Sequence, residues 1–271
     1  MDYVEPSRVL LAGDTHGNGR WVGNLCKLAQ QHRCEVILQL GDFGYWPHTS
    51  KGRRFLDQVD WHAERYGVSC LYWIDGNHEN HEMLAAEEAD DDGFATIRGR
   101  CRYAPRGHRW RWGQVRFGAL GGAFSMDHHY RVEGVNWWAG EMPTDADVTR
   151  LGDDPLDVLL CHDAPEGAPI REFELRPRDA LLCLQVRERI LQAVRITTPK
   201  LVVHGHWHRR TSSELAWTVG SDEDSRRLST QVEGLAADKQ GDHRAWAILE
   251  VDPLDFIDGA AQVSQAPRTA D

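Results

Sequence analysis

Three histidines alternate in the segment HGHWH at residues 204–208, directly after the apolar run KLVV. Neutral imidazole is the commonest protein ligand for transition metals, and Gly205 allows the backbone to turn tightly between two of the rings. Some of the 14 histidines in this chain will cluster on solvated loops by chance, but three at alternate positions after a buried run are harder to explain in that way. The segment therefore indicates a metal site whose other ligands lie elsewhere in the chain.

Other metal-capable side chains occupy similar positions, each after a short apolar run. They are Asp14 and His16 after RVLLAG, Asp42 after EVILQLG, Asn77 and His78 after CLYWIDG, and His162 after DVLLC. Carboxylates, imidazoles and an amide oxygen suit Mn²⁺, Fe or Zn²⁺, and the absence of cysteine among them argues against a structural zinc site. If the apolar runs are strands of α/β sheets, these side chains gather along one edge.

The order of these residues resembles the calcineurin-like metallophosphoesterase family, whose motifs are D-x-H, G-D, G-N-H-E/D, a single H and G-H-x-H. The chain has GDTHG at 13–17, GDFG at 41–44, GNHEN at 76–80, CHD at 161–163 and GHWH at 205–208, in the same order. One such motif occurs by chance in many proteins, whereas five at strand ends over about two hundred residues form a specific pattern. The resemblance covers about residues 8–210.

The resemblance implies two divalent metal ions with Asp42 between them. Its first metal site would consist of Asp14, His16, Asp42 and His208, and its second of Asp42, Asn77, His162 and His206. His78 corresponds to the family's catalytic histidine, which contacts the phosphate and stabilises or protonates the leaving group. His204 precedes the last motif, so we expect it to have a supporting or structural role. Mn²⁺ is the expected ion, although Fe, Zn²⁺ or Co²⁺ fit the same ligands.

The activity implied by this resemblance is hydrolysis of a phosphate mono- or diester by a hydroxide that bridges the two metals. Serine/threonine phosphatases of the same superfamily continue the second motif as G-D-x-x-D-R-G, but this chain has GDFGYWPHTS instead. Another cation must then bind the substrate phosphate. Arg131, in the loop GGAFSMDHHYRVEGVNWW, is a candidate, and a surface arginine without function is an equal alternative. We also expect Tyr45 and Trp46 to form an aromatic lining at the mouth of the site.

The short apolar runs alternate with helical patterns, which predicts an α/β fold. Helices are expected over residues 19–32, 53–66, 81–88 and 178–195. The later runs ELAWTVG and RAWAILEVD lack a helix between them and predict an antiparallel part. Together with the resemblance, these patterns indicate a four-layer αββα sandwich of mixed sheets, formed by one domain over residues 1–252. Residues 253–271 lose the periodicity and are expected to form a flexible tail.

The composition indicates a globular protein with no membrane partner. The chain has 271 residues, of which 41% are hydrophobic, enough for a sizeable core. No stretch approaches the roughly 18 apolar residues of a membrane span, and the N-terminal residues lack a signal-type apolar segment, so we expect a cytoplasmic protein. The six cysteines lack C-x-x-C spacing and mostly lie in apolar runs, where reduced thiols suffice. Nothing in the sequence indicates an obligate protein partner.

The charge of the chain does not by itself identify the substrate. A net charge of −11 argues against non-specific binding to long nucleic acids, but residues 98–116 contain seven arginines and no acid. In RWRW at 109–112, alternation would direct both tryptophans inward, which favours a strand over a dedicated nucleic-acid surface. A nucleotide or small phosphomonoester agrees with the acidic charge, and a nuclease acting on DNA or RNA is the alternative. A non-catalytic metal-binding scaffold is less favoured, because no motif ligand is missing.

Overall fold

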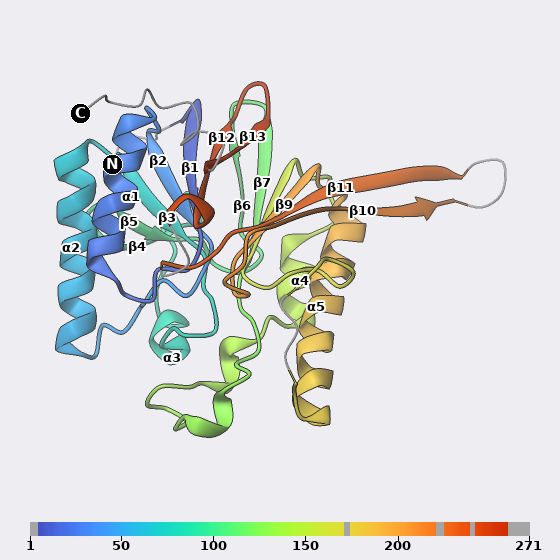
Figure 1. The fold of residues 1–271 in the computed structure, drawn as a ribbon, viewed down its shortest axis with the longest axis horizontal. Coiled ribbons are helices and arrows are strands. Elements are labelled where there is room, and N and C mark those ends of the chain that lie inside the picture. The colour runs from blue at the N-terminus through green and yellow to red at the C-terminus, as the bar shows by residue number, and fades with distance from the viewer. Residues whose placement is uncertain (1–4, 171–173, 221–224, 239–241, 260–271) are drawn as a thin grey trace, which may run out of the picture.

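The computed structural model describes residues 5–170, 174–220, 225–238 and 242–259. These residues form two mixed β-sheets with helices on their outer sides (Figure 1). The first sheet, in the order β13-β12-β1-β2-β3-β5-β4, consists of β1 (Arg8–Ala12), β2 (Val36–Gln39), β3 (Cys70–Trp73), β4 (Ala95–Arg98), β5 (Cys101–Tyr103), β12 (Trp246–Glu250) and β13 (Asp255–Asp258). The second, in the order β10-β11-β9-β8-β7-β6, consists of β6 (Arg109–Trp112), β7 (Val115–Leu120), β8 (Val158–Cys161), β9 (Leu201–His204), β10 (Thr211–Val219) and β11 (Arg226–Gly234).

Three hydrophobic cores separate four layers. The described helices are α1 (Gly19–Gln31), α2 (Ser50–Tyr66), α3 (His81–Leu84), α4 (Asp145–Leu151) and α5 (Pro177–Thr197), with 3₁₀ turns η1 (His128–Tyr130), η2 (Ala139–Glu141) and η4 (Asp242–Arg244). One core joins the first sheet to α1 and α2, a second lies between the sheets, and a third joins the second sheet to α4 and α5. This arrangement confirms the predicted αββα sandwich.

Strand β1 shows why residues 9–12 are all apolar. Val9 and Leu11 belong to the core between the sheets, whereas Leu10 and Ala12 face α1 and α2. Because successive side chains of a strand point to opposite faces, a strand covered on both sides needs an apolar residue at every position. Strands β1, β2 and β3 are parallel neighbours, as are β7, β8 and β9. Their carboxyl ends therefore bring together the loops that follow them.

The helices begin where side chains cap them. Asn18 accepts a hydrogen bond from the backbone N–H of Trp21 at the start of α1, and Thr49 accepts one from Gly52 at the start of α2. The Thr49 cap explains why α2 begins before the expected residue 53. The segment predicted as a helix over 81–88 forms only the single turn α3.

The end of the chain differs from the expected tail. Residues 255–258 form β13, which pairs antiparallel with β12, so the sheet extends past residue 252. Residues 260–271, the rest of the expected tail, lie outside the described residues. Among the helices that the structure describes, none is long and apolar enough to cross a membrane. All six cysteines are buried and unbonded, in agreement with reduced thiols.

Candidate metal centre

Two groups of metal-capable side chains share Asp42 at the ends of the central strands. In the first, Asp14, His16, Asp42 and His208 each offer a ligand atom within 4.8 Å of the others. Asp42, His162 and His206 form the second group in the same way. The amide oxygen Oδ1 of Asn77 lies 3.2 Å from Nε2 of His162 and joins the second group. These groups have the members that the resemblance implies for its two sites, brought together from five separate loops.

The backbone around the two groups is strained. His16, Asp42, His206 and His208 all have positive φ angles, of 48°, 50°, 63° and 49° respectively. The left-handed region costs about 1–2 kcal/mol for a residue with a side chain, and such strain persists only where the surrounding structure enforces it. Glycine is needed nearby for close approach: a Cβ at Gly205 would lie 2.3 Å from Oδ1 of Asp14, and one at Gly76 the same distance from Oδ1 of Asp42.

The electrostatics of the groups favour a bound cation. Asp14 and Asp42 are buried, with exposed fractions of 0% and 1%. Burial alone would raise the pKa of Asp42, but the charges of His78 and His162 outweigh it and hold this pKa well below its usual range. Conversely, burial lowers the pKa of His162, but the charge of Asp42 outweighs that effect and raises the pKa to about 10. The buried negative charge of Asp14 and Asp42 therefore favours the binding of a cation between these groups.

The ring of His206 has a nitrogen that can bind a metal ion. Burial lowers its pKa to about 3, so its ring stays neutral, and the buried Nε2 has no hydrogen-bond partner among the described residues. Its backbone N–H donates to Oδ1 of Asp14 over 3.0 Å, which fixes the position of the loop. An unpaired lone pair in a buried site costs free energy unless a metal or water occupies it. The donor set therefore fits divalent metal ions.

Several residues that orient the candidate ligands were not anticipated from the sequence. Nδ1 of His162 lies 2.6 Å from the backbone oxygen of Leu40, which directs Nε2 toward Asp42. Nδ1 of His16 lies 3.4 Å from Oδ1 of Asp238, a residue after β11. No motif surrounds Asp238 in the sequence, so only the fold reveals it.

A relay of hydrogen bonds positions Asn77. Its Nδ2 donates to Oγ of Ser125 over 2.9 Å, and Ser125 in turn donates to Oε2 of Glu141 over 2.6 Å. Glu141 is fully buried, and it also accepts the backbone N–H of Ser125 over 2.7 Å. Because the amide nitrogen is engaged, Oδ1 of Asn77 is left to face His162. Ser125 lies in the glycine-containing loop after β7, but nothing in the sequence marks Glu141.

Glu79, in the GNHEN motif, holds two of the site loops together. Its carboxylate accepts backbone N–H groups from Gly44 over 3.2 Å and from Gly76 over 2.7 Å. Burial and the charge of Asp42 raise the pKa of Glu79 to about 8. This side chain thus connects the loop after β2 to the loop after β3.

His78 and Arg131 lie side by side next to the two groups. Nε2 of His78 is 3.7 Å from Oδ2 of Asp42, and Nη2 of Arg131 is 3.2 Å from the same His78 nitrogen. Asp127 holds the guanidinium through contacts of 2.7 and 2.8 Å. Burial lowers the pKa of His78. The structure therefore places both residues next to Asp42 and the two ligand groups.

His204 belongs to neither group. It is buried, with 1% exposure, and its Nδ1 lies 3.1 Å from the backbone oxygen of Gly205. This position agrees with a supporting role. The expected aromatic lining is wrong for Tyr45, whose ring is fully buried and packs 5.6 Å from that of Trp73. Trp46 is half-buried beside Gly17.

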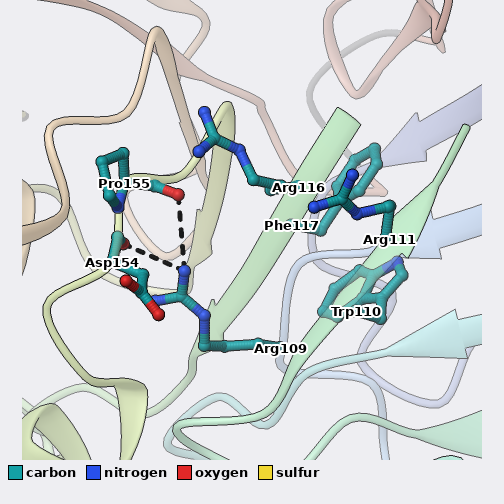
Figure 2. A pocket seen from close by; sticks show the side chains of 7 residues that line it. All are labelled: Arg109, Trp110, Arg111, Arg116, Phe117, Asp154 and Pro155. Carbon is teal, nitrogen blue, oxygen red and sulfur yellow. Dashed lines mark hydrogen bonds between the residues drawn. The ribbon is translucent and has the colours of Figure 1, made fainter. Parts of the chain in front are cut away.

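The arginine-rich stretch over 98–116 lies largely in strands and is held by internal contacts. A pocket of about 480 Å³ is lined by β6, β7 and the loop before β8. Figure 2 shows Arg109 in this pocket, where it donates to the backbone oxygens of Asp154 and Pro155. Four other arginines have carboxylate partners: Arg98 with Asp57, Arg102 with Asp90 and Asp92, Arg106 with Asp75, and Arg116 with Asp157. Trp112 is buried and Trp110 half-buried, as alternation predicts. The pocket lies beside the residues that precede β8, whereas His162 follows the other end of this strand.

Comparisons with known proteins agree with this architecture. A family model described as calcineurin-like phosphoesterase matches residues 7–210. No curated protein matches the chain in sequence. A dimetal phosphatase from Danio rerio has a similar structure, with a TM-score of 0.55, 12% identity, and coverage of 94% of this chain and 97% of that one. PhoD is also similar, with a TM-score of 0.50, 10% identity, and coverage of 94% and 64%. At these identities the likeness concerns the fold alone.

Proposed function

The chain belongs to the calcineurin-like phosphoesterase family, and from this membership we propose that it hydrolyses a phosphate ester with the help of two divalent metal ions. The observation that carries the proposal is the pair of ligand groups that share Asp42. Asp14, His16, Asp42 and His208 would hold one ion, and Asp42, Asn77, His162 and His206 the other. When bound, two such ions would supply a hydroxide from water at neutral pH and offset charge on the phosphoryl oxygens.

The protein's own side chains complete the site. His78 is positioned by its backbone N–H, which donates to Oδ1 of Asp42 over 2.9 Å. Its imidazole can donate a hydrogen bond to the leaving-group oxygen, and the adjacent Arg131 can bind the phosphate oxygens. Asp127 holds the guanidinium of Arg131 in place when no substrate is bound. Mn²⁺ is the ion that we propose, because hard carboxylates and an amide oxygen accompany the imidazoles.

We favour a nucleotide or another small phosphate ester over DNA or RNA as the substrate. The net charge of −11 disfavours a long polyanion, and most arginines of the 98–116 stretch are engaged with carboxylates or backbone oxygens. Single-stranded DNA should therefore bind weakly at physiological salt. Tight DNA binding that weakens steeply with salt would instead support a nuclease.

The test is hydrolysis of p-nitrophenyl phosphate and bis(p-nitrophenyl) phosphate by metal-stripped protein resupplied with Mn²⁺. Wild-type protein should hydrolyse at least one ester only after Mn²⁺ is added, and Asp42→Ala and His78→Ala should abolish or strongly reduce the rate. Asp57→Ala, at a carboxylate whose side chain is 65% exposed, is the control and should retain wild-type activity. The ratio of the two rates separates a phosphatase from a phosphodiesterase. If the protein binds metal but hydrolyses neither ester under any metal, a non-catalytic scaffold becomes the better interpretation.

A further inference from the structure

A third group of metal-capable side chains lies outside the centre described above. Ring nitrogens of His128 and His129 and a carboxylate oxygen of Asp179 all lie within 4.8 Å of one another. The histidines belong to η1, in the loop of residues 125–138, and Asp179 to the first turn of α5. None of the three lies in a family motif. Their meeting therefore needs a separate explanation.

Asp179 is the unusual member of this group. It is only 4% exposed, although it lies in the first turn of α5. The helix N-terminus offers partial positive charge, but a carboxylate that is mostly removed from water still carries a desolvation cost. A cation bound at the carboxylate would remove that cost. The two imidazoles beside it are the ligands with which carboxylates most often share a transition metal.

His128 is held in an orientation suitable for a ligand. Its Nδ1 lies 3.1 Å from the backbone oxygen of Ser125. Donation from Nδ1 to this carbonyl would leave the lone pair on Nε2 available, which is the usual arrangement of metal-binding histidines. Phe124 and Trp137 flank the ring at centroid distances of 5.1 and 5.9 Å and restrict its rotation. His129 is exposed and its ring is perpendicular to that of His128, so solvent and an ion can reach the group.

We propose that His128, His129 and Asp179 bind a third divalent ion of the Zn²⁺ class, with water completing its coordination. Two imidazoles and one carboxylate match a zinc site that keeps an open position. The ion would join the 125–138 loop to α5. Arg131 is in the same loop, two residues after His129, so the ion also holds Arg131 beside His78; this last consequence rests on the proposed function.

The number of zinc ions bound per chain tests the proposal directly. Metal-stripped protein is saturated with Zn²⁺, passed through a desalting column and analysed by mass spectrometry of its metal content. Wild-type protein should retain three ions, and Asp179→Asn and His129→Ala should each retain two. His48→Ala, which removes an exposed histidine outside all three groups, is the matched control and should retain three. Circular dichroism verifies that each variant is folded, and the exposed position of His129 makes its variant the safer of the two.

The outcomes separate this site from the binuclear centre. If wild type and both variants all retain two ions, the third site is overturned while the proposed function stands. If Asp42→Ala retains a single ion that the further change His129→Ala removes, the third site is independent of the centre. If wild type retains only one ion and His129→Ala none, the third site stands and the proposed function fails. Unchanged stoichiometry of three in a folded His129→Ala variant would also overturn the third site.

Discussion

Replacing Ser125 with alanine should impair metal binding without removing any ligand. Ser125 receives the hydrogen bond from Nδ2 of Asn77 over 2.9 Å and passes its own to Glu141 over 2.6 Å. In Ser125→Ala, Nδ2 of Asn77 keeps only its 3.3 Å contacts with the ring of His78, although Oδ1 still lies near His162. The amide can then rotate, and its oxygen no longer faces His162 reliably.

The size of the effect follows from these contacts. Loss of a residue that orients a metal ligand typically reduces metal affinity or activity by about 10–100-fold, which corresponds to about 1.4–2.7 kcal/mol. Glu141 loses one of its two hydrogen bonds from Ser125 and keeps the backbone N–H at 2.7 Å. A buried carboxylate that is short of one partner costs about 1–3 kcal/mol. Metal-free Ser125→Ala should therefore also unfold more easily than wild type, by about that amount.

The assay combines a Mn²⁺ titration of ester hydrolysis with urea unfolding of the metal-free protein. Ser213→Ala is the matched control, because Oγ of Ser213 has no hydrogen-bond partner among the described residues and lies on β10, away from the relay. It should change neither quantity. If Ser125→Ala keeps Mn²⁺ affinity and kcat/KM within twofold of wild type, the relay does not orient Asn77 and the reasoning is refuted.

Three further changes test other parts of the structure. Arg131→Ala should lower kcat/KM for the phosphate monoester by about 10–100-fold, because a charge-assisted hydrogen bond is lost. The loss for the diester should be smaller. Equal losses for the two esters in steady-state kinetics would contradict this prediction. Arg106→Leu leaves the buried Asp75 carboxylate without its cation and should destabilise the protein by about 3–5 kcal/mol in urea unfolding, whereas Arg98→Ala, at an exposed pair, should cost about 0–1 kcal/mol. Burial lowers the pKa of His108 from 6.5 to about 4. The unfolded chain therefore binds a proton at this histidine more readily than the folded protein does. The free energy of unfolding should fall as the pH drops from about 6.5 to about 4. His108→Phe should flatten that part of the stability profile, and an unchanged slope would disprove the assignment.

The sequence located the strands and the candidate ligands because both depend on local patterns. A strand buried on both faces needs apolar residues at successive positions, as residues 9–12 of β1 show, and polar residues gather near its end. Asp14 follows β1 after Gly13, and Asp42 follows β2 after Leu40 and Gly41. The α1 helix was predicted within one residue of its observed bounds, since its periodicity lies within the segment itself.

The supporting contacts could not be predicted in the same way. Asp238 is far from His16 in the chain, and Glu141 is 16 residues from Ser125, so no local pattern links the partners. The burial of Tyr45 was missed for a related reason: the chain turns inward after Asp42, and its ring enters the core against Trp73. Strand β13 was likewise assigned to a tail, because a short edge strand gains its order from pairing with β12.

The types and spacing of the residues were thus enough to indicate metal-dependent chemistry and the resemblance to a family. This is because ligand identity and strand burial are properties of short segments. Only the tertiary structure decided which atoms meet. It grouped the candidate ligands around Asp42, brought Arg131 to His78, and placed His128 and His129 near Asp179. Such contacts depend on how the two sheets and the helices pack, and the packing is fixed by side chains distributed over the whole chain.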